Sequence, residues 1–185
     1  EKLMYALILS GLAMQMIGNS RPASGAEHHI SHLWEMSVIN DPVDALHGEK
    51  VSVGLILTLE KYGKILECIE SGRCQVNGSA ELETELLKDT FDRKGLYEEV
   101  MEENGDSLLK SINQEQLAAQ LRDIAAELKK LPKYTEMQKK LKAAGCMTSM
   151  EELNLPDIKE LTLALSPYVR RRLTLMRISK LLELS

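Results

Sequence analysis

Hydrophobic residues saturate the start of the chain and become periodic further along it. From Lys2 to about Ile17 apolar side chains surround a predicted helix on all sides, which is typical of a helix in the middle of a bundle. From Glu81 onward the apolar positions recur at helical spacing, most clearly at Leu117, Leu121, Ile124, Leu128 and Leu131. This pattern predicts a series of amphipathic helices and an all-α, multi-helix bundle.

Turn-forming residues divide the first part of the chain. The segment Gly18–Pro22 ends the first predicted helix, because glycine permits a positive φ and proline disfavours a helical residue before it. Ser24 and Glu27 then form the S-x-x-E pattern of a capping box, so a second helix is predicted from Ser24 to about Met36. A third helix is predicted from near His47 to about Glu70, after a proline-containing turn.

Later breaks are less regular. Residues 71–80 are predicted to form one long loop, and Asn113 is predicted to cap the helix that follows it. Pro132, Gly145, Pro156 and Pro167 separate further helices. The last predicted helix carries an apolar stripe beside four arginines; the stripe is Val169, Leu173, Met176 and Leu182, and the arginines are Arg170, Arg171, Arg172 and Arg177.

Length and composition support a single helical domain over residues 1–185. The chain is 44% hydrophobic and only 4% aromatic, which favours helices over sandwiches and barrels. Its net charge of -5 gives no electrostatic reason to bind a phosphate backbone, so nucleic acid is not an expected partner.

The three cysteines and the apolar start bear on location. The cysteines have neither zinc-site spacing nor the density of a secreted disulfide scaffold, which indicates reduced thiols and a cytoplasmic protein. The run Leu3–Leu12, followed by Ala23–Ala26, also has the form of a signal peptide. Against that alternative, Gln15 follows closely and the run is too short to span a bilayer, so a buried helix from a longer protein fits better and no membrane span is expected.

The four histidines all fall in one short region, which makes it the main candidate for chemistry. On a helix His28 and His32 share one face, because they are four residues apart, whereas His29 points elsewhere. His47 begins the next helix, which can return against the second one. These residues are either a metal site lacking a carboxylate ligand or histidines used for packing and surface contacts.

Two basic residues near the histidines have similarly open roles. Arg21 precedes the start of a capped helix, where free amides and the helix dipole favour an anion. It could therefore bind a phosphate, or it could simply pair with Glu27. Lys50, in the first turn after His47, has the same two interpretations.

These residues carry a resemblance to a known family. The string from Ser20 to His28, S-R-P-A-S-G-A-E-H, with His32 and then the L-H-G-E-K-V string from Leu46 to Val51, resembles the sn-glycerol-1-phosphate dehydrogenases. These belong to the superfamily of iron-containing alcohol dehydrogenase, glycerol dehydrogenase and dehydroquinate synthase. The resemblance is strong over about residues 8–60 and identifies the C-terminal helical, metal-binding domain of a dehydroquinate synthase-like dehydrogenase.

The resemblance implies a metal-dependent reaction. A divalent zinc or nickel ion would be held by His28 and His47, with an aspartate from a preceding nucleotide-binding domain as third protein ligand. Neither that domain nor a glycine-rich G-x-G-x-x-G motif after a strand is found in this sequence. The chain is therefore expected to form one half of an active-site cleft and to be inactive alone.

The implied reaction is hydride transfer between NADH or NADPH and dihydroxyacetone phosphate, which yields sn-glycerol 1-phosphate for phospholipid biosynthesis. By position, His32 would orient the substrate or relay a proton, Arg21 and Ser24 would bind the phosphate, and Lys50 is a further candidate for substrate binding. The resemblance also implies a homodimer.

Two rival interpretations remain. A related glycerol dehydrogenase or dehydroquinate synthase would share the metal chemistry, although the Arg21-containing string argues against both. A helical interaction module without catalytic activity is the other. The arginines at 170–172 are expected to form a solvated helix face with glutamate partners rather than a polyanion site.

Overall fold

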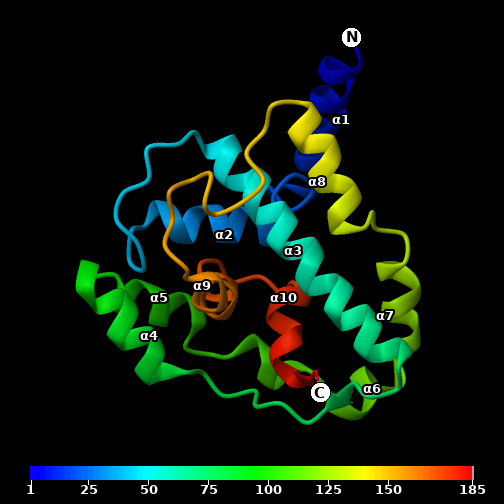
Figure 1. Cartoon of the computed structure of the whole chain (residues 1–185). Helices are drawn as coiled ribbons and strands as arrows, with labels where there is room; N and C mark the ends of the chain where they lie inside the picture. Colours follow the sequence, from blue (N-terminus) through cyan, green and yellow to red (C-terminus); the bar gives the residue numbers. More distant parts are fainter. Residues whose placement is uncertain (185) are drawn as a thin grey trace.

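The computed structural model describes residues 1–184, and helices make up nearly all of their regular structure (Figure 1). The all-α fold class is therefore confirmed. The described residues contain two short strands, β1 (Gln75–Val76) and β2 (Leu182–Glu183). They pair antiparallel, with Gln75 opposite Glu183, so the predicted loop at 71–80 is tied to the C-terminal segment.

The first and third predicted helices have their predicted bounds, whereas the later ones are shorter than predicted. The α-helices are α1 (Lys2–Ile17), α2 (Ala26–Glu35), α3 (His47–Glu70), α4 (Thr84–Phe91), α5 (Tyr97–Asn104), α6 (Gln114–Ala119), α7 (Leu121–Leu128), α8 (Tyr134–Ala143), α9 (Lys159–Leu165) and α10 (Leu175–Ile178). Short 3-10 turns lie at Asp92–Lys94, Leu108–Ser111, Ser166–Tyr168 and Ser179–Leu181.

Helices α2 and α3 pack closely, and Gly54 is what permits their approach. A Cβ atom at Gly54 would lie 2.6 Å from the carbonyl oxygen of Glu27 and 3.3 Å from the Cβ of Ile30. Any larger residue would therefore push the two helices apart. The contact fixes the spacing of the two helices that carry the histidines.

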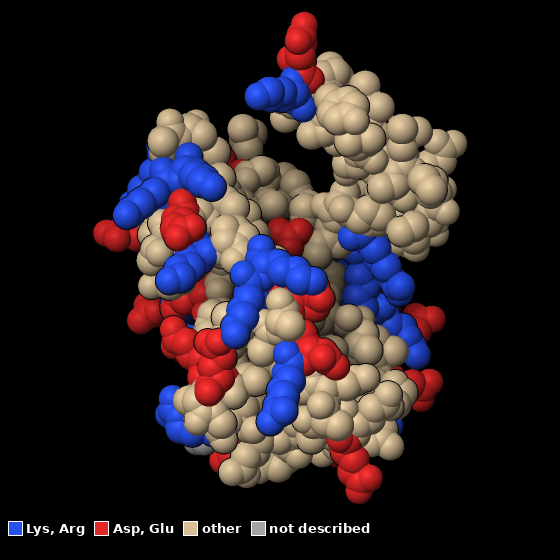
Figure 2. All heavy atoms as spheres, turned by 90° about the vertical axis from the view of Figure 1, so that its right-hand side faces the viewer, with Lys and Arg blue, Asp and Glu red and all other residues tan. Residues whose placement is uncertain are grey.

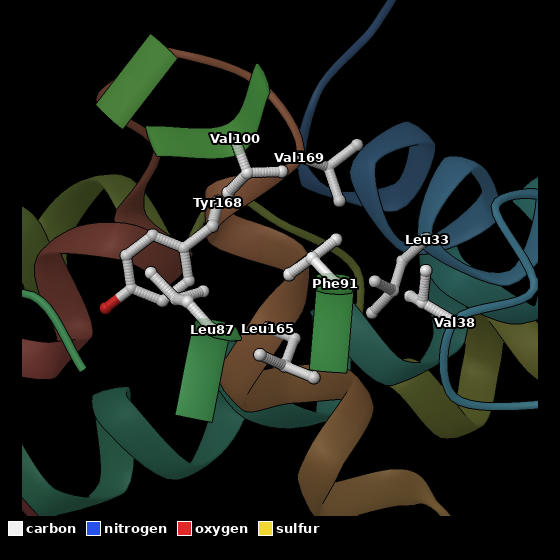
Figure 3. Packing of buried hydrophobic residues seen from close by; sticks show 8 residues of the cluster. All are labelled: Leu33, Val38, Leu87, Phe91, Val100, Leu165, Tyr168 and Val169. Carbon is white, nitrogen blue, oxygen red and sulfur yellow. The ribbon is translucent and has the colours of Figure 1, made fainter. Parts of the chain in front are cut away.

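Hydrophobic clusters lie on two sides of α2. On one side Leu33 packs with residues of α4, α5 and the turn after α9 (Figure 3); the buried members are Leu33, Val38, Leu87, Phe91, Val100, Leu165, Tyr168 and Val169. On the other side Ile30 and Trp34 pack against α3 and residues 147–158. Trp34 is fully buried and its Nε1 donates to Thr162 Oγ1 at 3.1 Å, so it anchors α2 in the core.

A third cluster surrounds the C-terminal half of α3. Its buried members are Ile65, Leu109, Leu117, Leu128, Leu181 and Leu182. It joins α6 and α7 to the last residues of the described chain. Since α3 contributes to the second and third clusters, it forms the central axis of the molecule (Figure 1).

The expectation that α1 lies in the middle of the bundle is wrong for the described residues. None of its side chains is buried, and Leu3 and Met16 are 74% and 87% exposed. The helix ends at Gly18, whose φ of 72° is left-handed, and it projects from the other helices (Figure 1). Figure 2 shows few charged side chains on this projecting part. A helix with this many exposed apolar side chains is typical of a contact with another part of the same protein or with another protein.

Two predicted helices are interrupted. The helix predicted across Leu117 and Leu131 is divided at Gln120 into α6 and α7, although Asn113 caps α6 as expected, accepting from the Gln116 amide at 2.9 Å. The prediction of one continuous last helix is wrong, because the chain forms a short turn at Ser166–Tyr168 and then bends before α10. Thr174 caps α10 with its side chain, and so fixes a new helix start after the bend.

No helix among residues 1–184 is both long enough and apolar enough to cross a membrane.

Candidate metal centre

The start of α2 differs from the predicted capping box. The helix begins at Ala26 with Gly25 as its N-cap, and Ser24 makes no side-chain cap bond, so the predicted start at Ser24 is wrong. Glu27 Oε1 instead accepts a hydrogen bond from the Gly25 amide at 2.8 Å. The glutamate of the pattern therefore acts as predicted, one position earlier in the helix, and its carboxylate is fixed beside His28.

Three histidine rings meet where α2 and α3 pack. The ring centroids of His28 and His32, both on α2, are 6.3 Å apart. His47, the first residue of α3, lies 5.4 Å from His28 and 5.3 Å from His32. The expected return of His47 against the second helix is thus observed. The fourth histidine, His29, is fully buried on another side of α2, as its position on the helix predicts.

Each of the three rings is held at Nδ1 by a carboxylate. Glu27 Oε1 lies 2.8 Å from His28 Nδ1. Glu35 serves two rings, since its Oε2 lies 3.0 Å from His32 Nδ1 and its Oε1 2.8 Å from His47 Nδ1. Glu35 is not among the site residues predicted from the sequence. Its position three residues after His32, on the same face of α2, is the sequence feature that points to it.

Opposing effects set the pKa values of these carboxylates. Burial alone raises the pKa of Glu35, but the hydrogen bonds from His47 and His32 outweigh it, and the pKa falls to about 2. Burial likewise raises the pKa of Glu27, while hydrogen bonds from His28 and the Gly25 amide bring it below its ordinary value. Both groups are therefore ionised at neutral pH and accept from the histidine rings.

The donor set fits a divalent transition metal. His32, Glu35 and His47 each offer a ligand atom, and these atoms lie within 4.8 Å of one another, with His28 adjacent. Imidazole nitrogens and carboxylate oxygens are ligands that zinc and nickel accept, and a catalytic zinc site uses three protein ligands and keeps one position open. The residues present can therefore hold such an ion.

Lys50 lies at the edge of the cluster. It is 8% exposed, and its Nζ is 3.5 Å from Glu35 Oε1. Its charge is therefore paired with the carboxylate that holds His32 and His47.

Arg21 lies on the exposed loop between α1 and α2. Its backbone amide donates a hydrogen bond to Asn19 Oδ1 at 3.0 Å, within the same loop. Within residues 1–184 its side chain makes no ion pair with Glu27, whose carboxylate is bonded to His28 and the Gly25 amide. The alternative of an Arg21–Glu27 pair is therefore not observed.

Arg172 contacts this loop from the other end of the chain. Its Nη1 donates to the Ser24 carbonyl oxygen at 2.8 Å and its Nη2 to Ser20 Oγ at 2.7 Å. The expected helix face at 170–172 is wrong, because these residues lie in the bend before α10. The expected glutamate partner exists for Arg170, whose Nη1 is 4.0 Å from Glu103 Oε1.

His29 is a neutral core residue. Both of its ring nitrogens are buried without a hydrogen-bond partner among the described residues. Burial, and then the charge of Arg172, lowers its pKa to about 4. It is therefore uncharged at neutral pH and turned away from the other three histidines.

A cavity of about 330 Å³ adjoins the cluster. Both apolar and charged side chains line it; they are His32, Glu35, Met36, Leu96, Glu99, Val100, Glu103, Tyr168, Val169 and Arg170. A small polar molecule in this cavity would contact His32 and Glu35 directly.

The cysteines are free thiols. Cys68 is buried, and burial raises the pKa of Cys74 to about 11. A thiol with a raised pKa stays protonated and is a poor nucleophile, and the free thiols agree with the expectation that the cysteines are reduced.

Comparison with known proteins gives one consistent result. A glycerol-1-phosphate dehydrogenase [NAD(P)+] of Bacillus licheniformis is 48% identical over 67 residues, which are 36% of this chain and 17% of that protein. The protein of the same name from Methanothermobacter thermautotrophicus is 40% identical over 72 residues, 39% of this chain and 20% of its own length. That from Staphylothermus marinus is 52% identical over 58 residues, 31% of this chain and 16% of its own.

The match is partial on both sides. The aligned part of this chain accounts for no more than a fifth of the length of these three relatives. No protein-family model and no solved structure matches the chain. The resemblance seen in the histidine region is nevertheless confirmed: over about a third of its length, this chain is homologous to the glycerol-1-phosphate dehydrogenases.

Proposed function

We propose that the chain is the helical, metal-binding domain of a dehydrogenase that interconverts dihydroxyacetone phosphate and sn-glycerol 1-phosphate with NAD or NADP. The observation that carries the proposal is the convergence of His28, His32 and His47 from two helices, each ring bonded at Nδ1 to a carboxylate. Homology to proteins named glycerol-1-phosphate dehydrogenase [NAD(P)+] supports the substrate and the cofactor.

His28 and His47 are the proposed metal ligands. Their rings are 5.4 Å apart, and their Nδ1 atoms are bonded to Glu27 and Glu35, so Nε2 is the atom left to bind a cation. A third ligand would come from another part of the full-length protein. Zinc and nickel both suit this set. A bound divalent cation would polarise the substrate carbonyl and stabilise the developing alkoxide.

Other residues are proposed to bind and orient the substrate. Arg21 and Ser24 lie just before α2, whose free amides and dipole favour an anion, and they are the proposed phosphate ligands. His32 borders the cavity beside the cluster, and there it would orient the substrate or pass a proton to its oxygen. Lys50, which is paired with Glu35, would contribute positive charge at the edge of the histidine cluster.

The cofactor is proposed to bind outside these 185 residues. The relatives are much longer than the aligned segment, and the described residues contain no parallel sheet of the kind that binds dinucleotides. A nucleotide-binding domain elsewhere in the full-length protein would complete the cleft. The 185 residues alone are then inactive, and the full-length enzyme acts in the cytoplasm as a homodimer.

The proposal is tested by NADH and NADPH oxidation in the full-length protein. Dihydroxyacetone phosphate should be reduced, unphosphorylated dihydroxyacetone should be a poor substrate, and a chelator should abolish the reaction until zinc or nickel is restored. Activity with dihydroxyacetone alone would favour a glycerol dehydrogenase. No activity with any metal would refute the proposal in favour of a helical interaction module.

A further inference from the structure

Glu35 joins the two helices of the metal centre through one carboxylate. Its Oε2 lies 3.0 Å from Nδ1 of His32, one turn earlier on α2, and its Oε1 lies 2.8 Å from Nδ1 of His47 on α3. The Ser31 hydroxyl donates to the same Oε1 at 3.3 Å, and Lys50 Nζ is 3.5 Å away. Both oxygens are therefore engaged by neighbouring donors.

Two roles are compatible with this position. The ligand atoms of His32, Glu35 and His47 lie within 4.8 Å of one another, so Glu35 could bind a cation directly. Alternatively, Glu35 could accept hydrogen bonds from Nδ1 of both rings, so that Nε2 of each ring is left free for another partner. The hydrogen bonds decide between these roles, because an ionised carboxylate has no proton to donate. Nδ1 must therefore be the donor in each ring, and a neutral ring then has its lone pair at Nε2.

We infer that Glu35 is a positioning residue of the metal centre, which fixes His47 and His32 as Nδ1–H tautomers, so that Nε2 of His47 is available to a divalent cation and Nε2 of His32 to the substrate. This inference rests on the proposed function, which supplies the cation. A carboxylate behind a metal-bound histidine commonly orients the ring and increases its basicity. Glu27 stands in the same relation to His28, at 2.8 Å.

Glu35 also links the two helices, because it lies on α2 and bonds to His47 on α3. His47 is the first residue of α3, where the backbone has no preceding helical turn to restrain it. Its side chain is 47% exposed, so packing alone holds it weakly. The bond to Glu35 supplies the restraint that packing does not, which is why its removal should affect His47 more than His32.

Glu35→Gln tests the inference in the full-length protein, which supplies the third proposed ligand, with Glu99→Gln as the matched control. Glu99 borders the same cavity and loses the same charge, but within residues 1–184 it bonds to no histidine. Zinc affinity is measured by chelator competition, and the ring nitrogens of metal-free protein are followed by 15N NMR. Circular dichroism confirms that both variants remain folded.

We expect Glu35→Gln to weaken zinc binding about 10–100-fold and Glu99→Gln to change it little. In metal-free wild type, His47 should be the Nδ1–H tautomer, and in Glu35→Gln it should shift towards Nε2–H. The visible spectrum of bound cobalt should keep its shape in the variant, because no ligand has been removed.

Other outcomes separate the possible failures. Unchanged zinc affinity and unchanged tautomers in Glu35→Gln overturn the positioning role and leave the proposed function intact. Weakened binding with an altered cobalt spectrum overturns it in favour of direct coordination by Glu35. Wild type that shows the expected tautomers but binds no zinc, nickel or cobalt refutes the proposed metal-dependent function, since the tautomer measurement needs no metal.

Discussion

Arg172 and Ser24, 148 residues apart in the sequence, are joined by a 2.8 Å hydrogen bond from the guanidinium to the Ser24 carbonyl oxygen. A second bond from Arg172 reaches Ser20 Oγ. The loop before α2, which carries the proposed phosphate ligands, is thus held by the C-terminal segment. This segment is distant in sequence, so no local pattern in the loop indicates it.

Removal of this anchor should loosen the loop without unfolding the protein. We expect Arg172→Met to speed hydrogen exchange and proteolysis across residues 18–25, because two side-chain bonds to the loop are lost. Arg172→Lys should restore part of the protection. Arg170→Met is the control, since among residues 1–184 the Arg170 side chain makes one ion pair, with the exposed Glu103 at 4.0 Å. Equal exchange in the Arg170 and Arg172 variants would argue against the anchor.

Gly54→Ala should separate α2 and α3. The added Cβ would lie 2.6 Å from the Glu27 carbonyl oxygen, and backbone cannot give way as a flexible side chain would. We expect a loss of about 1–3 kcal/mol in the free energy of unfolding, as for overpacked cores. Denaturant titration measures it.

Gly63→Ala is the matched control on the same helix. A Cβ at Gly63 meets no atom within 4 Å, so the substitution should stabilise the protein by about 0.5–1 kcal/mol through helix propensity. If the two variants changed stability alike, the close approach at Gly54 would not be a real constraint.

Among residues 1–184, Asn104 is the only hydrogen-bond acceptor of the buried Arg177 guanidinium, and it also donates to the Val100 and Tyr168 carbonyl oxygens at 2.9 Å. Asn104→Ala would leave a buried guanidinium without an acceptor. We expect a loss of about 3–5 kcal/mol, the range for an uncompensated buried charge. Asn77→Ala, which removes only an exposed bond to Glu183, should cost far less. A small loss for Asn104 would mean that water reaches Arg177.

Glu60 links stability to pH away from the histidines. Both of its oxygens lie 2.7 Å from Lys159 Nζ. Burial raises its pKa, but the bonds from Lys159 outweigh this, and the folded pKa lies below the ordinary 4.5. The unfolded state therefore binds the proton more tightly, so the contribution is present above pH 4.5 and is lost as pH falls through the folded pKa.

Glu60→Gln should consequently lower stability at pH 7 and flatten its dependence on pH below the ordinary value. Chemical denaturation at several pH values measures both effects. Glu67→Gln, two turns further along α3, is the control. An unchanged acid profile in Glu60→Gln would show that the pair with Lys159 does not influence folding.

Features that depend on neighbouring residues are predicted correctly from the sequence, whereas features that depend on contacts between distant segments are not. The bounds of α1 and α3 follow from apolar runs, a glycine stop and a turn, all of which are local. The bend at 170–172 was predicted as helix because its apolar spacing is helical, whereas Pro167 and the Thr174 cap interrupt it. The burial of α1 was predicted from hydrophobicity, which does not specify a partner.

The same distinction applies to the candidate site. His28, His32 and His47 were predicted together because helical spacing and a return turn bring them together. Glu35 was missed, although its spacing from His32 is helical, since its second contact reaches across to α3. Arg172 could not be linked to Ser24 at all, because only the tertiary fold brings the two ends of the chain together.

Zinc titration of the full-length protein by calorimetry tests the central claim most directly, because that protein supplies every proposed metal ligand. The account predicts one saturable site per chain in wild type, and binding weakened in the His28→Ala, His47→Ala variant by more than the roughly 100-fold upper range of an outer-shell change. Wild type without saturable binding, or a double variant that binds zinc as tightly as wild type, would contradict it.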